Sequence, residues 1–200
     1  MIDGQLRTSG VNDPHVLEAI NALPREDFVP PARRAVAYSD RSQPLGQGRV
    51  LAPVITHGQM LVEARPTPAD RALLIGGGTG YLAALLAPMV GSLTVIESDE
   101  GLAAAAPVQS GDWTIGSLEA GAAADAPFSL IVIDGAIEQV PDAIAAQLGE
   151  NGRIVTGLVE RGVNRLAVGR KANGRVGFVT VGEADFAVLE PFREPRRWSF

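Results

Sequence analysis

Cysteine is absent from the 200-residue sequence, and histidine occurs only at His15 and His57. Without cysteine the chain can form neither a disulfide framework nor a zinc site of the Cys/His type, so we expect no metal. Lysine is nearly missing too, since Lys171 is the single one, and arginine carries the positive charge. We interpret the two histidines as surface or helix residues rather than as catalytic bases.

The sequence also lacks a surplus of positive charge and a long apolar run. Its formal net charge is −6, which argues against DNA or RNA as a partner. Apolar runs such as 82–90 are far too short to cross a bilayer, and the first residues do not show the basic-then-apolar pattern of a signal peptide. We therefore expect a cytoplasmic protein that binds neither nucleic acid nor membrane.

What the sequence does contain is enough apolar material for one core, with 46% hydrophobic residues. A chain of this length can bury such a core without disulfides or metals. We expect a single domain over 1–200. Within it, residues 1–68 are expected to form an N-terminal cap and substrate region, and residues 69–200 a Rossmann-like sheet.

The first part of the chain is predicted to contain helices joined by irregular connections. Asp13 and Pro14 are a cap residue and a first-turn proline, so a short helix is predicted from there to Pro24. Residues 35–53 show no regular period and are therefore a candidate substrate region. A second helix is predicted at 55–62.

From residue 72 onward, apolar strands alternate with helices. The expected strands are 72–75, 93–97, 113–116, 128–134 and 153–158, and the expected helices are 81–90, 100–106 and 141–148. This pattern predicts an α/β fold with a doubly wound, mostly parallel sheet. The segments 163–169 and 175–181 predict a closing antiparallel hairpin. We interpret the arginine- and aromatic-rich end at 191–200 as packing onto the domain.

A glycine-rich turn, Gly76–Tyr81, follows the first of these strands. Its glycines allow a ligand to lie against backbone amides at the positive end of the next helix. Glu97 closes the next strand about 20 residues later, where an acid accepts the hydroxyls of a ribose. Ligands of open α/β sheets bind at the carboxyl ends of the strands. The expected cofactor-binding residues are therefore Gly76, Gly77, Gly78, Thr79, Gly80, Tyr81, Glu97, Ser98, Ser117, Leu118 and Asp134.

The glycine spacing fits two kinds of cofactor. Gly78, Gly80 and Ala83 satisfy the dinucleotide spacing, whereas Gly76, Gly78 and Gly80 satisfy the alternating spacing of S-adenosylmethionine sites. A long segment precedes the first sheet strand, and nothing later resembles a hydride-acceptor domain. Both features favour S-adenosylmethionine.

Several motifs carry a family resemblance that covers most of the chain. In chain order they are Gln5-Leu6, 16–20, 24–30, 37–40, 44–48, 76–81, 126–128, Val140-Pro141, Gln147-Leu148 and 151–155. The most specific are the proline–arginine–acid–aromatic block at 24–30 and the tyrosine–x–aspartate block at 38–40. On these residues the sequence resembles the protein-L-isoaspartate O-methyltransferase family of S-adenosylmethionine-dependent enzymes.

The resemblance implies a class I methyltransferase sheet with an N-terminal helical cap. It implies methyl transfer from S-adenosylmethionine to the carboxylate of isoaspartyl or D-aspartyl residues in damaged proteins or peptides. We expect a monomer or weak dimer. The residues that it places in the catalytic substrate region are Tyr38, Asp40, Arg49 and Ala52.

Three positions depart from the family pattern. Leu74 stands where the family has an acid beside the glycine loop, and Ser117 where it tends to have an aspartate. The segment 49–53 is one residue shorter than the family's and lacks its hydroxyls. Two alternatives therefore stay open: a non-catalytic relative that binds a cofactor or a protein partner, and a nicotinamide-dependent oxidoreductase.

Methyl transfer to a carboxylate needs no general base, because a carboxyl group with a pKa near 4 is already ionised at pH 7. The missing hydroxyls matter more, since one directed donor to a reacting anion is worth about 2.7–4 kcal/mol. We expect Arg49, Ser39 or Thr56 to hold the substrate carboxylate in their place.

Overall fold

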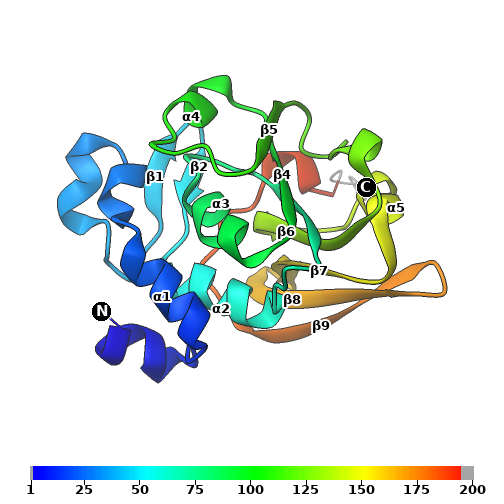
Figure 1. Ribbon diagram of the computed structural model, residues 1–200, viewed down its shortest axis with the longest axis horizontal. Coiled ribbons are helices and arrows are strands. Elements are labelled where there is room, and N and C mark those ends of the chain that lie inside the picture. The colour runs from blue at the N-terminus through cyan, green and yellow to red at the C-terminus, as the bar shows by residue number, and fades with distance from the viewer. Residues whose placement is uncertain (1, 195–200) are drawn as a thin grey trace, which may run out of the picture.

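The computed structural model describes residues 2–194, and its centre is a seven-stranded sheet (Figure 1). The strands are β1 (Gln43–Gly46), β2 (Arg49–Leu51), β3 (Arg71–Ile75), β4 (Ser92–Glu97), β5 (Asp112–Ile115), β6 (Phe128–Ile137), β7 (Leu148–Glu160), β8 (Val163–Ala172) and β9 (Arg175–Glu183). The order in the sheet is β5-β4-β3-β6-β7-β8-β9, while β1 and β2 form a separate antiparallel pair. Strands β3 to β7 run parallel, and β7, β8 and β9 pair antiparallel. The predicted mostly parallel sheet with an antiparallel end is confirmed.

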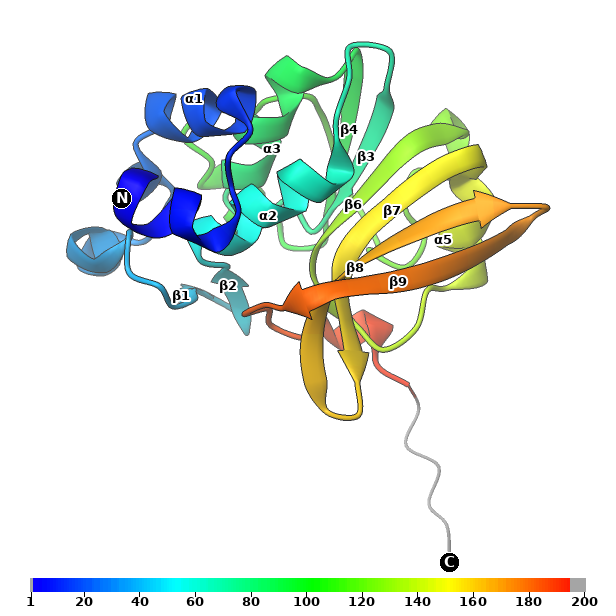
Figure 2. The ribbon, with the colours of Figure 1, turned by 90° about the horizontal axis from the view of Figure 1, so that it is seen from below.

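Helices cover both faces of the sheet. They are α1 (Pro14–Ala22), α2 (Val54–Ala64), α3 (Tyr81–Leu86), α4 (Glu100–Ala104) and α5 (Asp142–Gln147). Figure 2 shows α1, α2 and α3 on one side and α5 on the other. Successive side chains of β3 point to opposite faces of the sheet. Leu74 packs in the core with α1 to α3, whereas Leu73 and Ile75 pack with Ile144 of α5. Burial on both faces explains why these strands are apolar throughout.

A capping residue sets the start of α1, and a proline sets the end of α3. The Asp13 side chain accepts hydrogen bonds from the amides of His15 and Val16, as expected of a helix cap. The helix predicted at 81–90 is shorter than expected, because α3 ends at Leu86 and a 3-10 turn containing Pro88 follows. Proline has no amide hydrogen with which to continue the α-helical ladder.

The segment 35–53 is more regular than the sequence suggested. A 3-10 helix covers Pro31–Val36, and the β1–β2 hairpin follows it. The hairpin turn is made of three residues with positive φ, Gly46, Gln47 and Gly48. At the other end of the chain, Phe192 is buried in the core beside α5, whereas the predicted packing of 195–200 lies outside the described residues.

None of the helices within residues 2–194 combines the length and the apolar character that a bilayer crossing requires.

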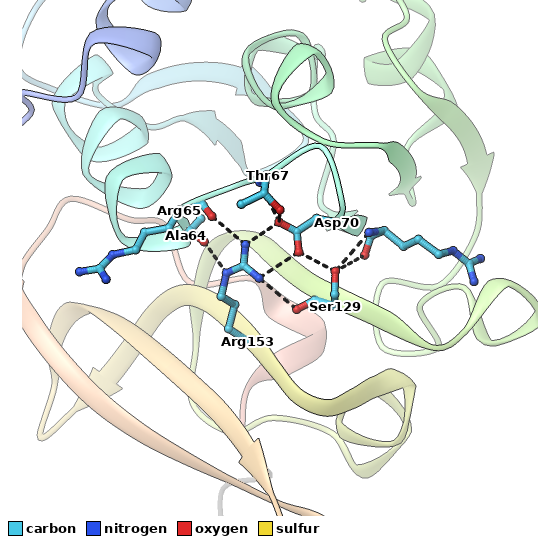
Figure 3. A network of polar contacts seen from close by, with 7 residues as sticks. Ala64, Arg65, Thr67, Asp70, Ser129 and Arg153 are labelled. Carbon is cyan, nitrogen blue, oxygen red and sulfur yellow. Dashed lines mark hydrogen bonds and ion pairs between the residues drawn. The ribbon is translucent and has the colours of Figure 1, made fainter.

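A polar network joins the amino ends of three sheet strands, on the side opposite the carboxyl ends (Figure 3). Asp70, just before β3, binds Arg153 of β7 at 2.7 Å and accepts a 2.6 Å hydrogen bond from Ser129 of β6. Thr67 donates to Asp70 from its amide and its hydroxyl, and Arg153 also donates to the carbonyl of Ala64 at the end of α2. Burial alone would raise the pKa of Asp70, but the hydrogen bonds from Arg153, Ser129 and Thr67 hold it well below the ordinary value of 3.8.

We expect Asp70→Asn to lower the free energy of unfolding by about 2–3 kcal/mol at pH 7, because it removes the charge that Arg153 binds. A carboxylate with a lowered pKa in the folded protein stabilises it above the unfolded-state pKa and loses that effect as the pH falls. The difference between the two proteins should therefore shrink below about pH 4. Urea denaturation across pH measures this. Asp112→Asn, on an exposed strand position, is the control, and equal losses in both variants would contradict the prediction.

Candidate active site

The carboxyl ends of β3, β4 and β6 meet at one edge of the sheet. The chain leaves β3 for β4 and β5 on one side and returns with β6 on the other side of β3. Such a reversal opens a crevice for ligands in doubly wound sheets. A cleft of about 820 Å³ lies at this edge, and the predicted site residues that line it are Arg49, Ala52, Ser98, Leu118 and Asp134.

The glycine loop lies beside this cleft in the predicted strand–turn–helix arrangement. Gly76 and Gly78 have φ values of 85° and 54°, which side chains rarely adopt. A Cβ at Gly76 would lie 3.1 Å from Arg49 Nη2 and 3.5 Å from the backbone oxygen of Asp134. Glycine therefore lets two other segments approach the loop closely.

Glu97 is fully buried at the end of β4, and its carboxylate accepts hydrogen bonds from three directions. Oε2 accepts one from the amide of Gly78 at 2.7 Å. Oε1 accepts from the amides of Ser98 and Asp99 at 2.7 and 3.0 Å. Oε1 also binds Arg49 Nη1 at 2.7 Å, in an ion pair whose arginine side chain is 14% exposed. Glu97 thus joins the loop, the start of α4 and the β1–β2 hairpin.

Thr79 and Tyr81 tie the loop to the N-terminal cap. The Thr79 hydroxyl donates a 2.6 Å hydrogen bond to the carbonyl of Phe28. The buried Tyr81 ring packs edge-on against Phe28 at 5.2 Å and against His57 at 5.5 Å. Neither residue is among the described residues that line the cleft. These two side chains therefore hold the glycine loop against the N-terminal cap and do not face the cleft.

Arg25 is a fully buried arginine that connects the cap to the cleft wall. Its Nε donates to the carbonyl of Ala37 at 2.7 Å, and its Nη2 donates to the carbonyl of Ala52 at 2.5 Å. The guanidinium lies 4.8 Å from the centre of the Tyr81 ring. Burial lowers the pKa of Arg25, and interactions with Tyr81 and Asp134 oppose this effect. The sequence marked Arg25 only as part of a family motif, not as the residue that fixes Ala52.

His57 and Asp134 form a second buried pair. His57 lies in α2 as expected, but its side chain is fully buried rather than at the surface, and its Nε2 is 3.0 Å from Asp134 Oδ1. His57 Nδ1 has no hydrogen-bond partner among the described residues. A neutral ring with its proton on Nε2 avoids a buried unpaired N–H, so we assign His57 as the donor and Asp134 as the acceptor. Asp134 lies within β6.

The remaining predicted residues lie away from the cleft or at its edge. Tyr38 donates a 2.5 Å hydrogen bond to Glu26, and burial together with this bond raises the pKa of Tyr38 to about 12. Asp40 is exposed and accepts a hydrogen bond from Gln5. Neither Tyr38 nor Asp40 is among the described residues that line the cleft, so the structure does not bring these two predicted substrate residues to it.

The last predicted residues are Ser117, Leu118 and the three candidates for holding a substrate carboxylate. Ser117 is exposed after β5 and does not line the cleft, whereas its neighbour Leu118 does. Of the three candidates for holding a substrate carboxylate, Ser39 accepts a hydrogen bond from Gln43 and Thr56 is buried in α2. Arg49 is the candidate that lines the cleft. Within residues 2–194, no three His, Cys, Asp or Glu side chains converge as metal ligands would.

We expect Arg25→Met to lower the free energy of unfolding by about 2–4 kcal/mol, because the carbonyls of Ala37 and Ala52 would be left buried without donors. Arg25→Lys should recover only part of this loss, since one ammonium cannot replace the planar fork. Arg34→Met is the matched control, as Arg34 is exposed and 3.8 Å from Asp27. It should change stability by less than about 0.5 kcal/mol. Urea denaturation gives both values, and equal losses would contradict the assignment.

Known proteins match this chain over most of its length. The family model for protein-L-isoaspartate(D-aspartate) O-methyltransferase matches residues 1–190. The protein-L-isoaspartate O-methyltransferase of Koribacter versatilis (strain Ellin345) is 35% identical over 94% of this chain and 88% of its own length. That of Methanoculleus marisnigri is 32% identical over 94% and 89%.

Solved structures show the same fold at low identity. A protein-L-isoaspartate O-methyltransferase structure has a TM-score of 0.76 at 20% identity and covers 92% of this chain, which in turn spans 63% of that longer chain. A putative enzyme of this kind from Plasmodium falciparum, in complex with S-adenosyl-L-homocysteine, has a TM-score of 0.77 at 16% identity and covers 92% and 94%. With the family model and the relatives above, these findings show that the chain belongs to the protein-L-isoaspartate(D-aspartate) O-methyltransferase family.

Proposed function

We propose that this protein transfers a methyl group from S-adenosylmethionine to the carboxylate of isoaspartyl or D-aspartyl residues in damaged proteins or peptides. The observation that carries the proposal is the buried Glu97 carboxylate beside the glycine loop, in a chain of this family. The family assignment decides against the nicotinamide alternative. Three properties remain predictions from the sequence. These are the cytoplasmic location of the protein, the lack of a nucleic-acid partner, and its state as a monomer or weak dimer.

The residues at the strand ends fit a nucleoside cofactor. Gly76 has no side chain of its own to cover the loop backbone, and Glu97 places an acceptor at the end of β4 for the ribose hydroxyls. Ser98 and Leu118 line the cleft beside the loop and are proposed to flank the nucleoside. When bound, S-adenosylmethionine supplies a methyl group on a positively charged sulfur.

Asp134 is proposed to replace the acid that the family has at Leu74. Leu74 is fully buried in the core and offers no charge to a ligand. Asp134 lies one strand away, at the level of Gly76, and its side chain is 10% exposed into the cleft. The hydrogen bond from His57 holds this carboxylate in place. Asp134 thereby offers negative charge to the cationic end of the cofactor.

For the acceptor, this site has to hold an ionised carboxylate in line and exclude water, and no proton has to be removed. Ala52 offers only an apolar surface there, and its carbonyl is already held by Arg25. The anion holder therefore has to come from another side chain, for which Arg49 is proposed. The absence of a hydroxyl in this segment is also the observation that favours the second candidate function, a relative that binds the cofactor without transferring methyl.

Transfer of labelled methyl from S-adenosylmethionine to an isoaspartyl peptide tests the proposal directly. We expect transfer, and we expect Glu97→Gln to lower kcat/KM for the cofactor at least about tenfold, because the loop amides and the ribose lose a charged acceptor. The same peptide with asparagine at the isoaspartyl position is the control substrate. Cofactor binding without any transfer would contradict the proposal and support the non-catalytic alternative.

Asp134→Asn should weaken S-adenosylmethionine binding by roughly 10- to 100-fold, the value of one charge-assisted contact. Glu100→Gln removes an exposed acid that lines the same cleft and should leave the affinity within about twofold. Isothermal titration calorimetry measures both. If the two variants bind alike, the role of Asp134 is wrong.

A further inference from the structure

Arg49 lies on the carboxylate that the cofactor needs. Its Nη1 is 2.7 Å from Glu97 Oε1, and its Nη2 lies 3.1 Å from the point where a Cβ on Gly76 would be. The guanidinium therefore covers the first glycine of the loop as well as the acid. A nucleoside that lies against this loop and reaches Glu97 would have to take the same space.

Glu97 has little capacity left for another donor. Each carboxylate oxygen has about two lone-pair positions, and Oε1 already accepts from Arg49 and from the amides of Ser98 and Asp99, with the Ser98 hydroxyl at 3.3 Å, whereas Oε2 accepts from the amide of Gly78. The three amides belong to the backbone of the loop and of the turn before α4, and they are fixed by the fold. Arg49 is the donor that can withdraw, because it is held at the end of a long side chain.

Arg49 can turn away from Glu97 without disturbing the main sheet. Strand β2 pairs with β1 in a two-stranded sheet that is separate from the seven-stranded one. The residues after Arg49 stay fixed, because Leu51 is buried in the core and the Ala52 carbonyl accepts a hydrogen bond from Arg25. The Arg49 side chain is 14% exposed, so it can change its partner while the β1–β2 hairpin stays in place.

The charges of the cleft show why a released Arg49 would matter. Among the described residues that line it, the acidic ones are Asp99, Glu100, Asp134 and Glu190. The positive ones are Arg49 and Arg193, and Arg193 Nε is already 2.6 Å from Glu190. An acceptor carboxylate that enters this acidic cleft needs a cation that no acid of the protein holds. Arg49 becomes such a cation when it leaves Glu97.

We propose that Arg49 alternates between two carboxylates. It binds Glu97 in the cofactor-free protein, and it binds the carboxylate of the methyl acceptor once the cofactor ribose has taken Glu97. This exchange rests on the proposed function. It makes cofactor binding and acceptor binding favour each other, and it makes Arg49 the residue that selects anionic acceptors.

Titration with S-adenosylhomocysteine tests the first half of the exchange without turnover. Arg49→Met should bind this ligand at least about tenfold more tightly than the unaltered protein, because no ion pair has to be broken. Arg193→Met, an arginine on the same cleft wall with a different acid, should bind within about twofold of it. Circular dichroism checks that both variants are folded. Unchanged or weaker binding by folded Arg49→Met overturns the proposal.

The second half is tested on the unaltered chain, which keeps the proposal falsifiable if Arg49→Met does not fold. A saturating isoaspartyl peptide should tighten S-adenosylhomocysteine binding at least about fivefold, because each ligand favours the state with Arg49 released. The same peptide with asparagine should have no effect. If the isoaspartyl peptide leaves the affinity unchanged or lowers it, the exchange does not occur.

Failure of the exchange and failure of the proposed function give different results. Tighter binding by Arg49→Met without methyl transfer by the unaltered protein refutes the proposed function and leaves the Arg49–Glu97 competition intact. Methyl transfer together with unchanged affinity in Arg49→Met refutes the exchange alone.

Discussion

The buried carboxylate of Glu97 organises the cleft. It fixes the glycine loop through Gly78, the start of α4 through Ser98 and Asp99, and the N-terminal hairpin through Arg49. A buried carboxylate is tolerated only when its oxygens are fully hydrogen-bonded or paired with a cation. Any ligand that takes one of these oxygens must therefore replace the donor that it displaces, and this requirement couples the ligand to the rest of the site.

The fold supplies the rigid frame for that coupling. Parallel strands β3, β4 and β6 bring the glycine loop, Glu97 and Asp134 to one edge. The cap is attached to the loop through the Thr79 hydroxyl and through the buried Arg25, whose guanidinium lies over the Tyr81 ring. Arg49 lies on the β1–β2 hairpin, outside the main sheet, so its side chain can change its partner while this frame stays fixed.

Much of this arrangement could be predicted from the sequence, because the strands, the glycine loop and Glu97 leave local patterns. The β1–β2 hairpin could not, since strands of four and three residues show no usable period. Two buried polar pairs beside the cleft were also beyond the sequence. Arg49 and Glu97 are 48 residues apart, and His57 and Asp134 are 77 apart, so only the three-dimensional fold brings them together. The family motif places Tyr38 in the substrate region, whereas in the structure its hydroxyl binds Glu26 and it is not among the described residues that line the cleft.

The departures from the family pattern also form a consistent set in three dimensions. An acid is missing at Leu74 and one is present on the neighbouring strand at Asp134. Hydroxyls are missing at 49–53 and an arginine is present at the start of that segment. In the first case an acid is kept on a different strand, and in the second a charged donor stands where neutral hydroxyl donors are missing.

A crystal structure of the unaltered protein with S-adenosylhomocysteine would show whether Glu97 exchanges Arg49 for the cofactor. We expect ribose hydroxyls within hydrogen-bond distance of the Glu97 carboxylate and the Arg49 guanidinium turned away into the cleft. A complex in which Arg49 still binds Glu97 and the nucleoside lies elsewhere would contradict it.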